Sequence, residues 1–213
     1  MEETMAKPKA LLLFSGGLDS VVLLNDLIDA GYEVHPMFIH YSQKGFNEEF
    51  DCFHYWIQKF GLEKTFKILD LPAMSWSKST IGNRGVETGD SFKDEYMEMR
   101  NMIFISYAAS YAQAKGIPQI YTGFIHTENY NDTDEKFTKA IDLLLTVSAG
   151  ISVIAPYQTV TKEGVVELAR DDLQMDMEEL FTNSMSCNTP AMGKPCGKCY
   201  GCQEIDRLKK IFL

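Results

Sequence analysis

The sequence predicts an α/β fold: an open, mostly parallel, Rossmann-like sheet of five strands with helices on both faces, followed by a small C-terminal metal-binding segment. Short apolar runs bounded by glycine or proline alternate with longer segments whose apolar residues recur at helical spacing. Strands that alternate with helices are joined by right-handed crossovers and form a parallel sheet. Four of the five cysteines follow residue 186. We therefore expect one domain over residues 1–181 and a cysteine-rich segment over residues 182–213 that packs on it.

The composition restricts the kinds of partner. A chain of 213 residues with 45% hydrophobic residues can form a single packed core. Its formal net charge of -10 argues against a broad electrostatic surface for nucleic acid and favours a small-molecule substrate. The sequence shows neither an apolar signal core nor a stretch of roughly 18 apolar residues. We expect a cytoplasmic protein that binds no membrane and makes no direct contact with nucleic acid.

The first strand is expected at residues 10–14, a run of five hydrophobic residues that leads into the loop Ser15-Gly-Gly-Leu-Asp-Ser20. Apolar residues recur at helical spacing from Val21 onward, so the loop joins a buried strand to the start of a helix. Such a junction binds anions, because the first N–H groups of a helix lack partners and the helix dipole is positive there. The glycines let the backbone approach a phosphate, and the serines add hydroxyl donors. An ordinary glycine-rich turn is the alternative.

The later elements continue the alternation. Phe46, Phe50 and Phe53 recur at helical spacing. Pro156 ends a short strand, and Thr161 is placed to cap a helix. Further strands are expected at residues 33–40, 65–70, 118–123 and 151–155, and further helices at residues 46–60, 102–116, 137–149 and 161–170. Residues 74–95 show no apolar period and are expected to form a long loop, which in a compact domain is usually functional or mobile.

The loops that follow the expected strands are predicted to meet. Ligands of open parallel sheets bind beyond the carboxyl ends of the strands. The loop at Ser15, the loop after His40, the region from Met74 to Arg100 and the loop after Gly123 should all open onto that edge. The sequence therefore predicts one pocket formed by four loops.

The cysteines near the C-terminus predict a metal site. They are Cys187, Cys196, Cys199 and Cys202, the last three separated by two residues each. Four thiolates satisfy tetrahedral zinc and leave no open position, which is typical of a structural site. An iron–sulfur cluster can use the same ligands, and a redox Cys-x-x-Cys pair accounts for only two of them. Cys52 is expected to be a buried apolar residue of the aromatic helix.

Several motifs, taken in order, carry a family resemblance. They are Phe14-Ser-Gly-Gly-Leu-Asp-Ser20, Phe38-Ile-His-Tyr41, Arg100-Asn101-Met-Ile-Phe104, Thr122-Gly123 and the four terminal cysteines. Together they resemble the QueC family of 7-cyano-7-deazaguanine synthases, which belongs to the PP-loop ATP pyrophosphatases. The resemblance implies an adenine-nucleotide α-hydrolase-like fold, a zinc site and a homodimer. It also implies conversion of 7-carboxy-7-deazaguanine, ATP and ammonia to the nitrile, through an acyl adenylate, an amide and a second activation, on the route to queuosine.

The resemblance also implies roles for particular residues. The catalytic set would be Ser15, Asp19, Ser20 and Arg100, with Asp19 helping to hold Mg²⁺ at the leaving pyrophosphate. ATP would be bound by Phe14, Ser15, Gly16, Gly17, Leu18, Asp19, Ser20, His40 and Gly123. The deazaguanine would be bound by Tyr41, Phe92, Arg100, Tyr130 and Asp132. Zinc would be held by Cys187, Cys196, Cys199 and Cys202.

Two departures from the family pattern bear on the substrate. Met97-Glu98-Met99 stands where the family usually has Val-Pro-x, and Glu128-Asn-Tyr-Asn-Asp-Thr-Asp-Glu135 replaces a stretch of the type Tyr-Pro-Asp-Cys-Arg. A proline and an arginine are thereby lost. Two alternatives follow. One is a diverged relative that adenylates a deazaguanine or another carboxylate and joins it to an amine of a protein or metabolite. The other is a non-catalytic ATP-binding interaction module. A tRNA-thiolating enzyme is disfavoured, since the chain is short and acidic.

Overall fold

The computed structural model describes residues 6–82, 94–125, 130–190 and 193–213. Five strands form one sheet in the order β3-β2-β1-β4-β5, and all four pairings between them are parallel. The strands are β1 (Lys9–Leu13), β2 (Glu33–His40), β3 (Lys67–Asp70), β4 (Gln119–Thr122) and β5 (Ser152–Ile154). The predicted open parallel sheet is confirmed.

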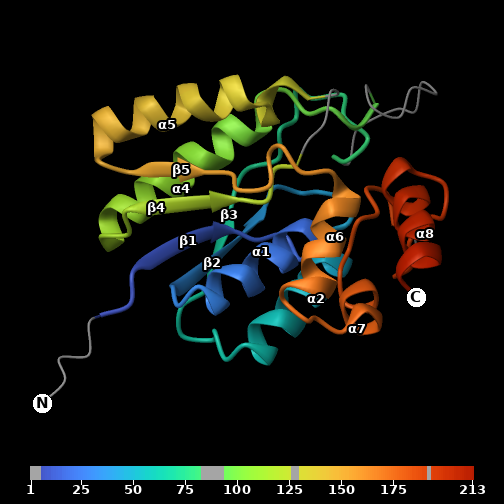
Figure 1. Ribbon diagram of the computed structural model, residues 1–213. Helices are drawn as coiled ribbons and strands as arrows, with labels where there is room; N and C mark the ends of the chain where they lie inside the picture. The colour runs from blue at the N-terminus through green and yellow to red at the C-terminus, as the bar shows by residue number, and fades with distance from the viewer. Residues whose placement is uncertain (1–5, 83–93, 126–129, 191–192) are drawn as a thin grey trace, which may run out of the picture.

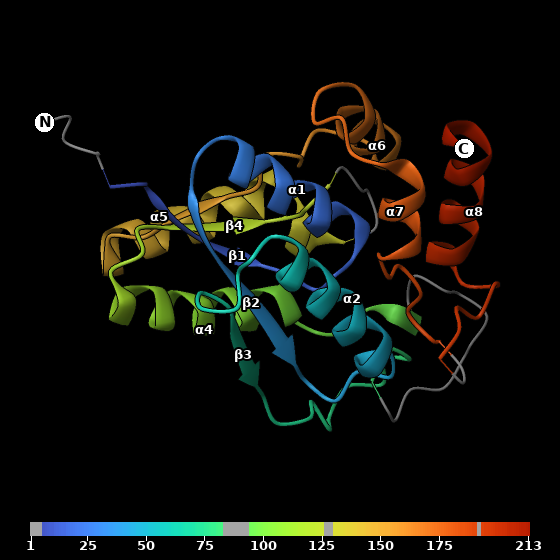
Figure 2. The same cartoon turned by 90° about the horizontal axis from the view of Figure 1, so that it is seen from below.

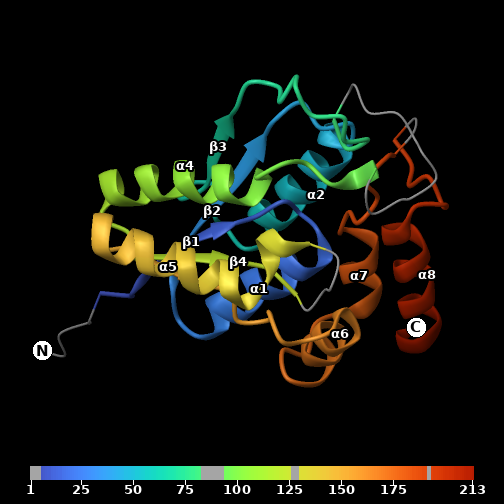
Figure 3. The same ribbon diagram turned by 90° about the horizontal axis from the view of Figure 1, so that it is seen from above.

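Helices cover both faces of the sheet (Figure 1). On one face lie α1 (Leu18–Asp29) and α2 (Phe46–Lys59), which are seen in the view from below in Figure 2. On the other face lie α4 (Arg100–Lys115) and α5 (Glu135–Ala149), which are side by side in Figure 3. The remaining helices are α6 (Lys162–Asp171), α7 (Met177–Thr182) and α8 (Tyr200–Phe212), with a 3-10 turn at Asn131–Thr133. No helix in the described ranges is long and apolar enough to cross a membrane.

Strand β1 is buried on both sides, as its unbroken apolar run predicts. Ala10 and Leu12 pack into the core under α1 and α2, and Leu11 packs into the second core under α4. All three side chains are fully buried. The strand therefore holds the loop that follows it at the centre of the molecule.

Most predicted elements agree with the structure, and their ends differ for local reasons. Strand β3 begins two residues later than expected, because the backbone N–H groups of Thr65 and Phe66 both donate to Leu62 O in the turn after α2. Helix α5 begins two residues earlier, because the Asp134 side chain caps it by accepting from Phe137 N at 2.7 Å. Thr161 caps α6 as predicted.

The predictions do not include α7 and α8. Helix α7 has only six residues, which is too short for a periodic signal. Helix α8 does carry one, because Ile205, Leu208 and Phe212 recur at helical spacing and pack on the main core. The cysteine pattern overlaps the start of this helix and predicts a metal site there rather than a helix.

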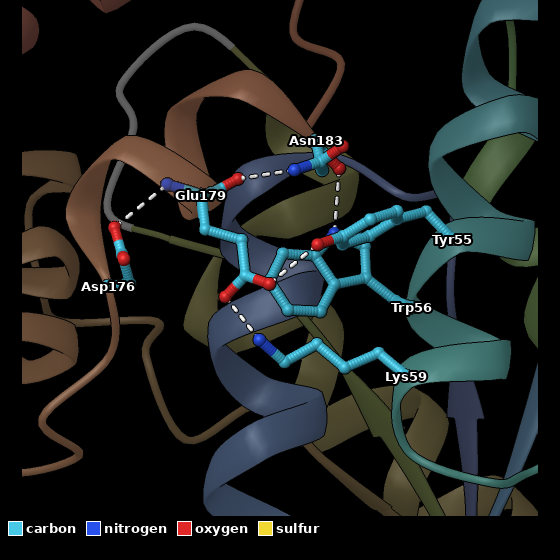
Figure 4. A network of polar contacts seen from close by, with 6 residues as sticks. All are labelled: Tyr55, Trp56, Lys59, Asp176, Glu179 and Asn183. Atoms are coloured by element: carbon cyan, nitrogen blue, oxygen red, sulfur yellow. Dashed lines mark hydrogen bonds and ion pairs between the residues drawn. The ribbon is translucent and has the colours of Figure 1, made fainter.

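Polar contacts fasten α7 to α2 (Figure 4). Glu179 accepts a hydrogen bond from Tyr55 and forms an ion pair with Lys59, and Trp56 Nε1 donates to Asn183 O at 2.7 Å. Two residues further on, Met185 N donates to Gly16 O at 3.0 Å. The C-terminal segment is thus attached first to α2 and then to the loop after β1.

The first turn of α8 is packed so closely that only glycine fits there. A Cβ atom at Gly201 would lie 1.9 Å from Ser186 O, a backbone atom. At Gly164 in α6 a Cβ would lie 2.9 Å from Val160 Cγ1, the end of a side chain that can move. We predict that Gly201→Ala lowers the free energy of unfolding by roughly 2 kcal/mol or more, despite the better helix propensity of alanine. Gly164→Ala, the matched control, should change it by about 1 kcal/mol or less.

Urea unfolding of the two variants and the wild-type protein tests this difference. Equal stability of Gly201→Ala and Gly164→Ala would show that the contact with Ser186 does not constrain the chain.

Candidate functional site

A cavity of about 770 Å³ lies at the carboxyl ends of the strands. Its wall includes the residues after β1, β2 and β4, the first turns of α1, α4, α6 and α8, and part of the cysteine segment. Most residues predicted for the site line it together: Phe14, Ser15, Gly17, Leu18, Asp19, Ser20, Tyr41, Arg100, Gly123, Tyr130 and Asp132. The predicted convergence of loops on one pocket is therefore seen in the described part of the chain.

Two of the predicted residues lie outside the cavity wall, and the position of a third is not described. Gly16 is buried within the loop and does not line the cavity. His40 interacts with Asp70, with 3.0 Å between Nδ1 and Oδ1, and is not among the residues that line the cavity. Phe92 lies outside the described residues.

The loop after β1 needs glycine at its second position. Gly16 has a φ of +76°, and a Cβ there would lie 2.8 Å from both Glu49 O and Phe53 N of α2. The loop is closed by its serines, since Gly17 N donates to Ser15 Oγ at 3.2 Å and Ser20 Oγ donates to Gly17 O at 2.8 Å. This arrangement exposes the start of α1 to the cavity, where its N–H groups and dipole favour an anion.

A lysine whose side chain is 12% exposed lies beside this loop. Lys162 begins α6, and its Nζ lies 3.2 Å from Asp19 Oδ2 and 3.6 Å from Glu204 Oε2. Burial alone lowers the pKa of Lys162, but the two carboxylates more than offset this, so its pKa is raised and the ammonium stays charged. A buried cation next to the start of α1 can bind a phosphate. The sequence offers one signal for it, because a lysine in the first turn of a helix is otherwise unfavourable.

Asp19 has the properties of a cation ligand. Its Oδ1 is buried and accepts no hydrogen bond from any described residue, and the same holds for Thr122 Oγ1, which also lines the cavity. A buried carboxylate oxygen without a partner is costly, and coordination of a hard cation such as Mg²⁺ satisfies it. The residues therefore fit the predicted magnesium ion.

At the other end of the cavity, Arg100 lies among acidic groups and tyrosine. Burial alone lowers the pKa of its guanidinium, but Tyr41 and Asp132, with a further contribution from Glu49, raise it above its usual value. Asp132 is buried and accepts a bond from Asn101 N at 3.3 Å. The divergent acidic loop thus supplies a carboxylate that faces Arg100.

Two tyrosines provide flat apolar surface in the same cavity. The rings of Tyr96 and Tyr130 are nearly parallel, with 12° between their planes and 6.4 Å between their centroids. Burial and then Glu95 raise the pKa of Tyr130 to about 12, so its hydroxyl stays protonated. Such rings can stack on a planar ligand.

Two further acidic groups of the cavity are not predicted from the sequence. Burial raises the pKa of Glu49 to about 7, and the carboxylate accepts a hydrogen bond from Gln43. Burial also raises the pKa of Glu95, whose carboxylate accepts a bond from Asn188 at 2.6 Å. Neither residue belongs to a motif or a periodic pattern, so only the fold brings them to the cavity.

The four predicted metal ligands form one cluster. The sulfur atoms of Cys187, Cys196, Cys199 and Cys202 all lie within 4.8 Å of one another. Four thiolates at this spacing fit a single zinc ion. Cys52 is separate from them and is half-buried rather than buried as expected, because it lies off the inner face of α2. Burial still raises the pKa of its thiol to about 11, so the thiol is unreactive. Cys187 also lines the cavity, so the metal site and the candidate active site share a wall.

Known proteins resemble the chain over most of its length. The family described as "Queuosine biosynthesis protein QueC" matches residues 9–209. A 7-cyano-7-deazaguanine synthase 1 of Desulfitobacterium hafniense (strain Y51) is 32% identical over 210 residues, which cover 95% of this chain and 92% of the relative. A 7-cyano-7-deazaguanine synthase of Rickettsia akari (strain Hartford) is 29% identical over 223 residues, covering 95% of each chain.

The fold has solved counterparts as well. The U34-tRNA thiolase NcsA from Methanococcus maripaludis superposes with a TM-score of 0.51 at 13% identity, covering 99% of this chain and 70% of that chain. At this identity the likeness concerns the fold alone. The family match and the sequence relatives extend further, and by them the chain belongs to the QueC family.

Proposed function

We propose that this chain is an ATP-dependent 7-cyano-7-deazaguanine synthase, which converts 7-carboxy-7-deazaguanine and ammonia to the nitrile. The proposal rests on one observation, a cavity whose two ends carry different chemical groups. The loop after β1, Lys162 and Asp19 suit a triphosphate and its metal ion, and Arg100 with Tyr130 suits a flat polar ring. The names of the sequence relatives agree with this substrate.

In the first step the substrate carboxylate attacks the α-phosphorus of ATP. The bond from that phosphorus to the bridging oxygen breaks, so pyrophosphate leaves and an acyl adenylate remains. The N–H groups at the start of α1, the hydroxyls of Ser15 and Ser20 and the charge of Lys162 hold the phosphates in line and stabilise the charge that develops. Asp19 would hold Mg²⁺, which when bound neutralises charge on the leaving pyrophosphate.

In the second step ammonia attacks the acyl carbon and AMP leaves, which forms the amide. The amide oxygen then attacks the α-phosphorus of a second ATP, and pyrophosphate leaves. The bond from carbon to that oxygen next breaks, AMP leaves with the oxygen, and the nitrogen gives up both of its protons as the nitrile forms. Both activations use the same phosphate-binding groups of the protein, so one site serves both. Arg100 and the neighbouring tyrosines keep the ring in place between the two activations.

One observation keeps the conjugating relative as a second candidate. Asp132 comes from the divergent loop and faces Arg100, so the positive charge of Arg100 is partly balanced before any anionic substrate binds. An enzyme that retains the adenylating end of the cavity but changes the other end can transfer the acyl group to an amine of a protein or metabolite. The homodimer and the cytoplasmic location stay predictions.

The deciding experiment is to incubate the protein with 7-carboxy-7-deazaguanine, ATP, Mg²⁺ and ammonia and to follow the products by mass spectrometry. We expect nitrile, AMP and pyrophosphate. Accumulated adenylate or amide would favour the conjugating relative. AMP released with other carboxylates but not with this acid would contradict the deazaguanine assignment. ATP binding without pyrophosphate release for any acid would indicate an interaction module.

We predict that Asp19→Asn leaves the fold intact and lowers pyrophosphate release about 100-fold or more, because it removes charge from the proposed metal site at nearly constant volume. Asp29→Asn, at the exposed far end of the same helix, is the matched control and should release pyrophosphate at the wild-type rate. Circular dichroism checks the fold of both. Unchanged turnover of Asp19→Asn would remove Asp19 from the site.

We predict one tightly bound zinc ion per chain. The Cys196→Ser and Cys199→Ser double variant should lose it, and Cys52→Ala should retain it. Loss of the metal should unfold the cysteine segment. Because this segment also lines the cavity and Met185 N donates to Gly16 O, its unfolding should weaken ATP binding. Metal analysis and calorimetry with ATP measure the two effects. Iron–sulfur absorbance, or free thiols without metal in the wild-type protein, would contradict the prediction.

A further inference from the structure

Glu49 places a carboxylate in the cavity close to the loop after β1. It lies in the first part of α2, and its backbone oxygen packs under Gly16, 2.8 Å from where a Cβ there would stand. Its side chain lines the cavity and interacts electrostatically with Tyr41 and Arg100. Glu49 and the loop after β1 therefore belong to the wall of one cavity.

Gln43 fixes one oxygen of this carboxylate. Gln43 is 3% exposed. Its Oε1 accepts from Tyr41 N at 2.9 Å, and its Nε2 donates to Ile39 O at 3.2 Å and to Glu49 Oε2 at 3.0 Å. Because the backbone partners determine which end of the amide is the donor, the orientation of Gln43 is set by the fold. Glu49 Oε2 is thereby held in place. A carboxylate oxygen that accepts one hydrogen bond can accept a second, so both oxygens of Glu49 can accept from a ligand.

The charges around Glu49 favour a ligand edge that donates hydrogen bonds. Burial raises the pKa of Glu49 to about 7, although the Gln43 bond and the charge of Arg100 act to lower it. Arg100 also interacts with Asp132, so one cation stands among two carboxylates. A second donor to Glu49 would offset the cost of burying the ionised form.

A guanine-type ring has such an edge. Its N1–H and 2-amino groups point in the same direction and match the two oxygens of a carboxylate, whereas adenine offers one donor and one acceptor on the corresponding edge. We propose that Glu49 binds the N1–H and 2-amino edge of the 7-deazaguanine ring and so selects a guanine-type substrate. This inference rests on the proposed function.

Calorimetry on the full chain with a non-hydrolysable ATP analogue present tests it. The ligands are 7-carboxy-7-deazaguanine and the same acid without its 2-amino group. The variants are Glu49→Gln and, as a matched control on the same helix, Asp51→Asn, whose side chain is exposed. We expect the wild-type protein and Asp51→Asn to prefer the 2-amino acid by roughly 10- to 100-fold, and Glu49→Gln to lose most of this preference, since an amide accepts only one of the two bonds.

Binding of the ATP analogue alone, which should be alike in all three proteins, shows that the cavity is intact. If Glu49→Gln keeps the wild-type preference, the inference is overturned and the proposed function stands. If the wild-type protein binds neither acid, the proposed function fails and the inference fails with it.

The pH dependence offers an independent readout. Only ionised Glu49 accepts both bonds, so the affinity of the wild-type protein for the 2-amino acid should fall as the pH decreases through about 7, approaching tenfold per pH unit, and that of Glu49→Gln should not. The groups that interact with Glu49 are Glu48 and Cys52 on α2, Tyr41 and Gln43 after β2, and Arg100 on α4. The pKa values of Tyr41 and Cys52 are raised to about 12 and 11 by burial, so neither group titrates near pH 7. A wild-type affinity that is flat between pH 8 and 6 overturns the proposal.

Discussion

The close backbone approach at Gly16 is the constraint on which the rest of the site depends. The residue has a left-handed conformation, and its missing side chain lets the carbonyl of Glu49 and the amide of Phe53 pack against the loop. On the other side, Met185 N donates to Gly16 O. Three parts of the chain that are far apart in sequence therefore meet at one peptide unit. Any side chain there would push α2 away from the loop.

This packing explains why the cysteine cluster matters to the cavity although its metal site is closed. The cluster lies between Met185, which is bonded to the loop, and α8, whose first turn contacts Ser186 and lines the cavity. A metal ion held by four thiolates supplies folding free energy to a segment that has little apolar core of its own. The wall that contains Tyr200 and Glu204 therefore depends on thiolates that would bind the metal ion rather than the substrate.

The electrostatics of the cavity are locally balanced in an acidic protein. Lys162 stands between Asp19 and Glu204, and Arg100 stands among Glu49, Asp132 and Tyr41. Each buried cation is held by carboxylates and keeps its charge. A phosphate near Lys162 would replace the carboxylates as the partner of the lysine, and those carboxylates could then bind a metal ion. The acidic groups near Arg100 would still accept hydrogen bonds from donors on a ring. In the proposed function, one end of the cavity would therefore bind phosphate and the other would bind hydrogen-bond donors of a ring.

The sequence by itself determined the α/β class, the alternation of strands and helices, the loop from Ser15 to Ser20, the four cysteines that cluster and, by resemblance, the family. Each of these depends on residues close together in the chain or on a periodic pattern. Only the tertiary structure decided that Lys162, Glu49 and Glu95 face the cavity and that His40 and Gly16 do not. These placements depend on how distant elements pack together. A single charged residue on a helix belongs to no periodic pattern, so the sequence does not predict which groups it contacts. The path of the C-terminal segment across the cavity is of the same kind, since it follows from contacts of α7 with α2 and of Met185 with Gly16 that no local spacing encodes.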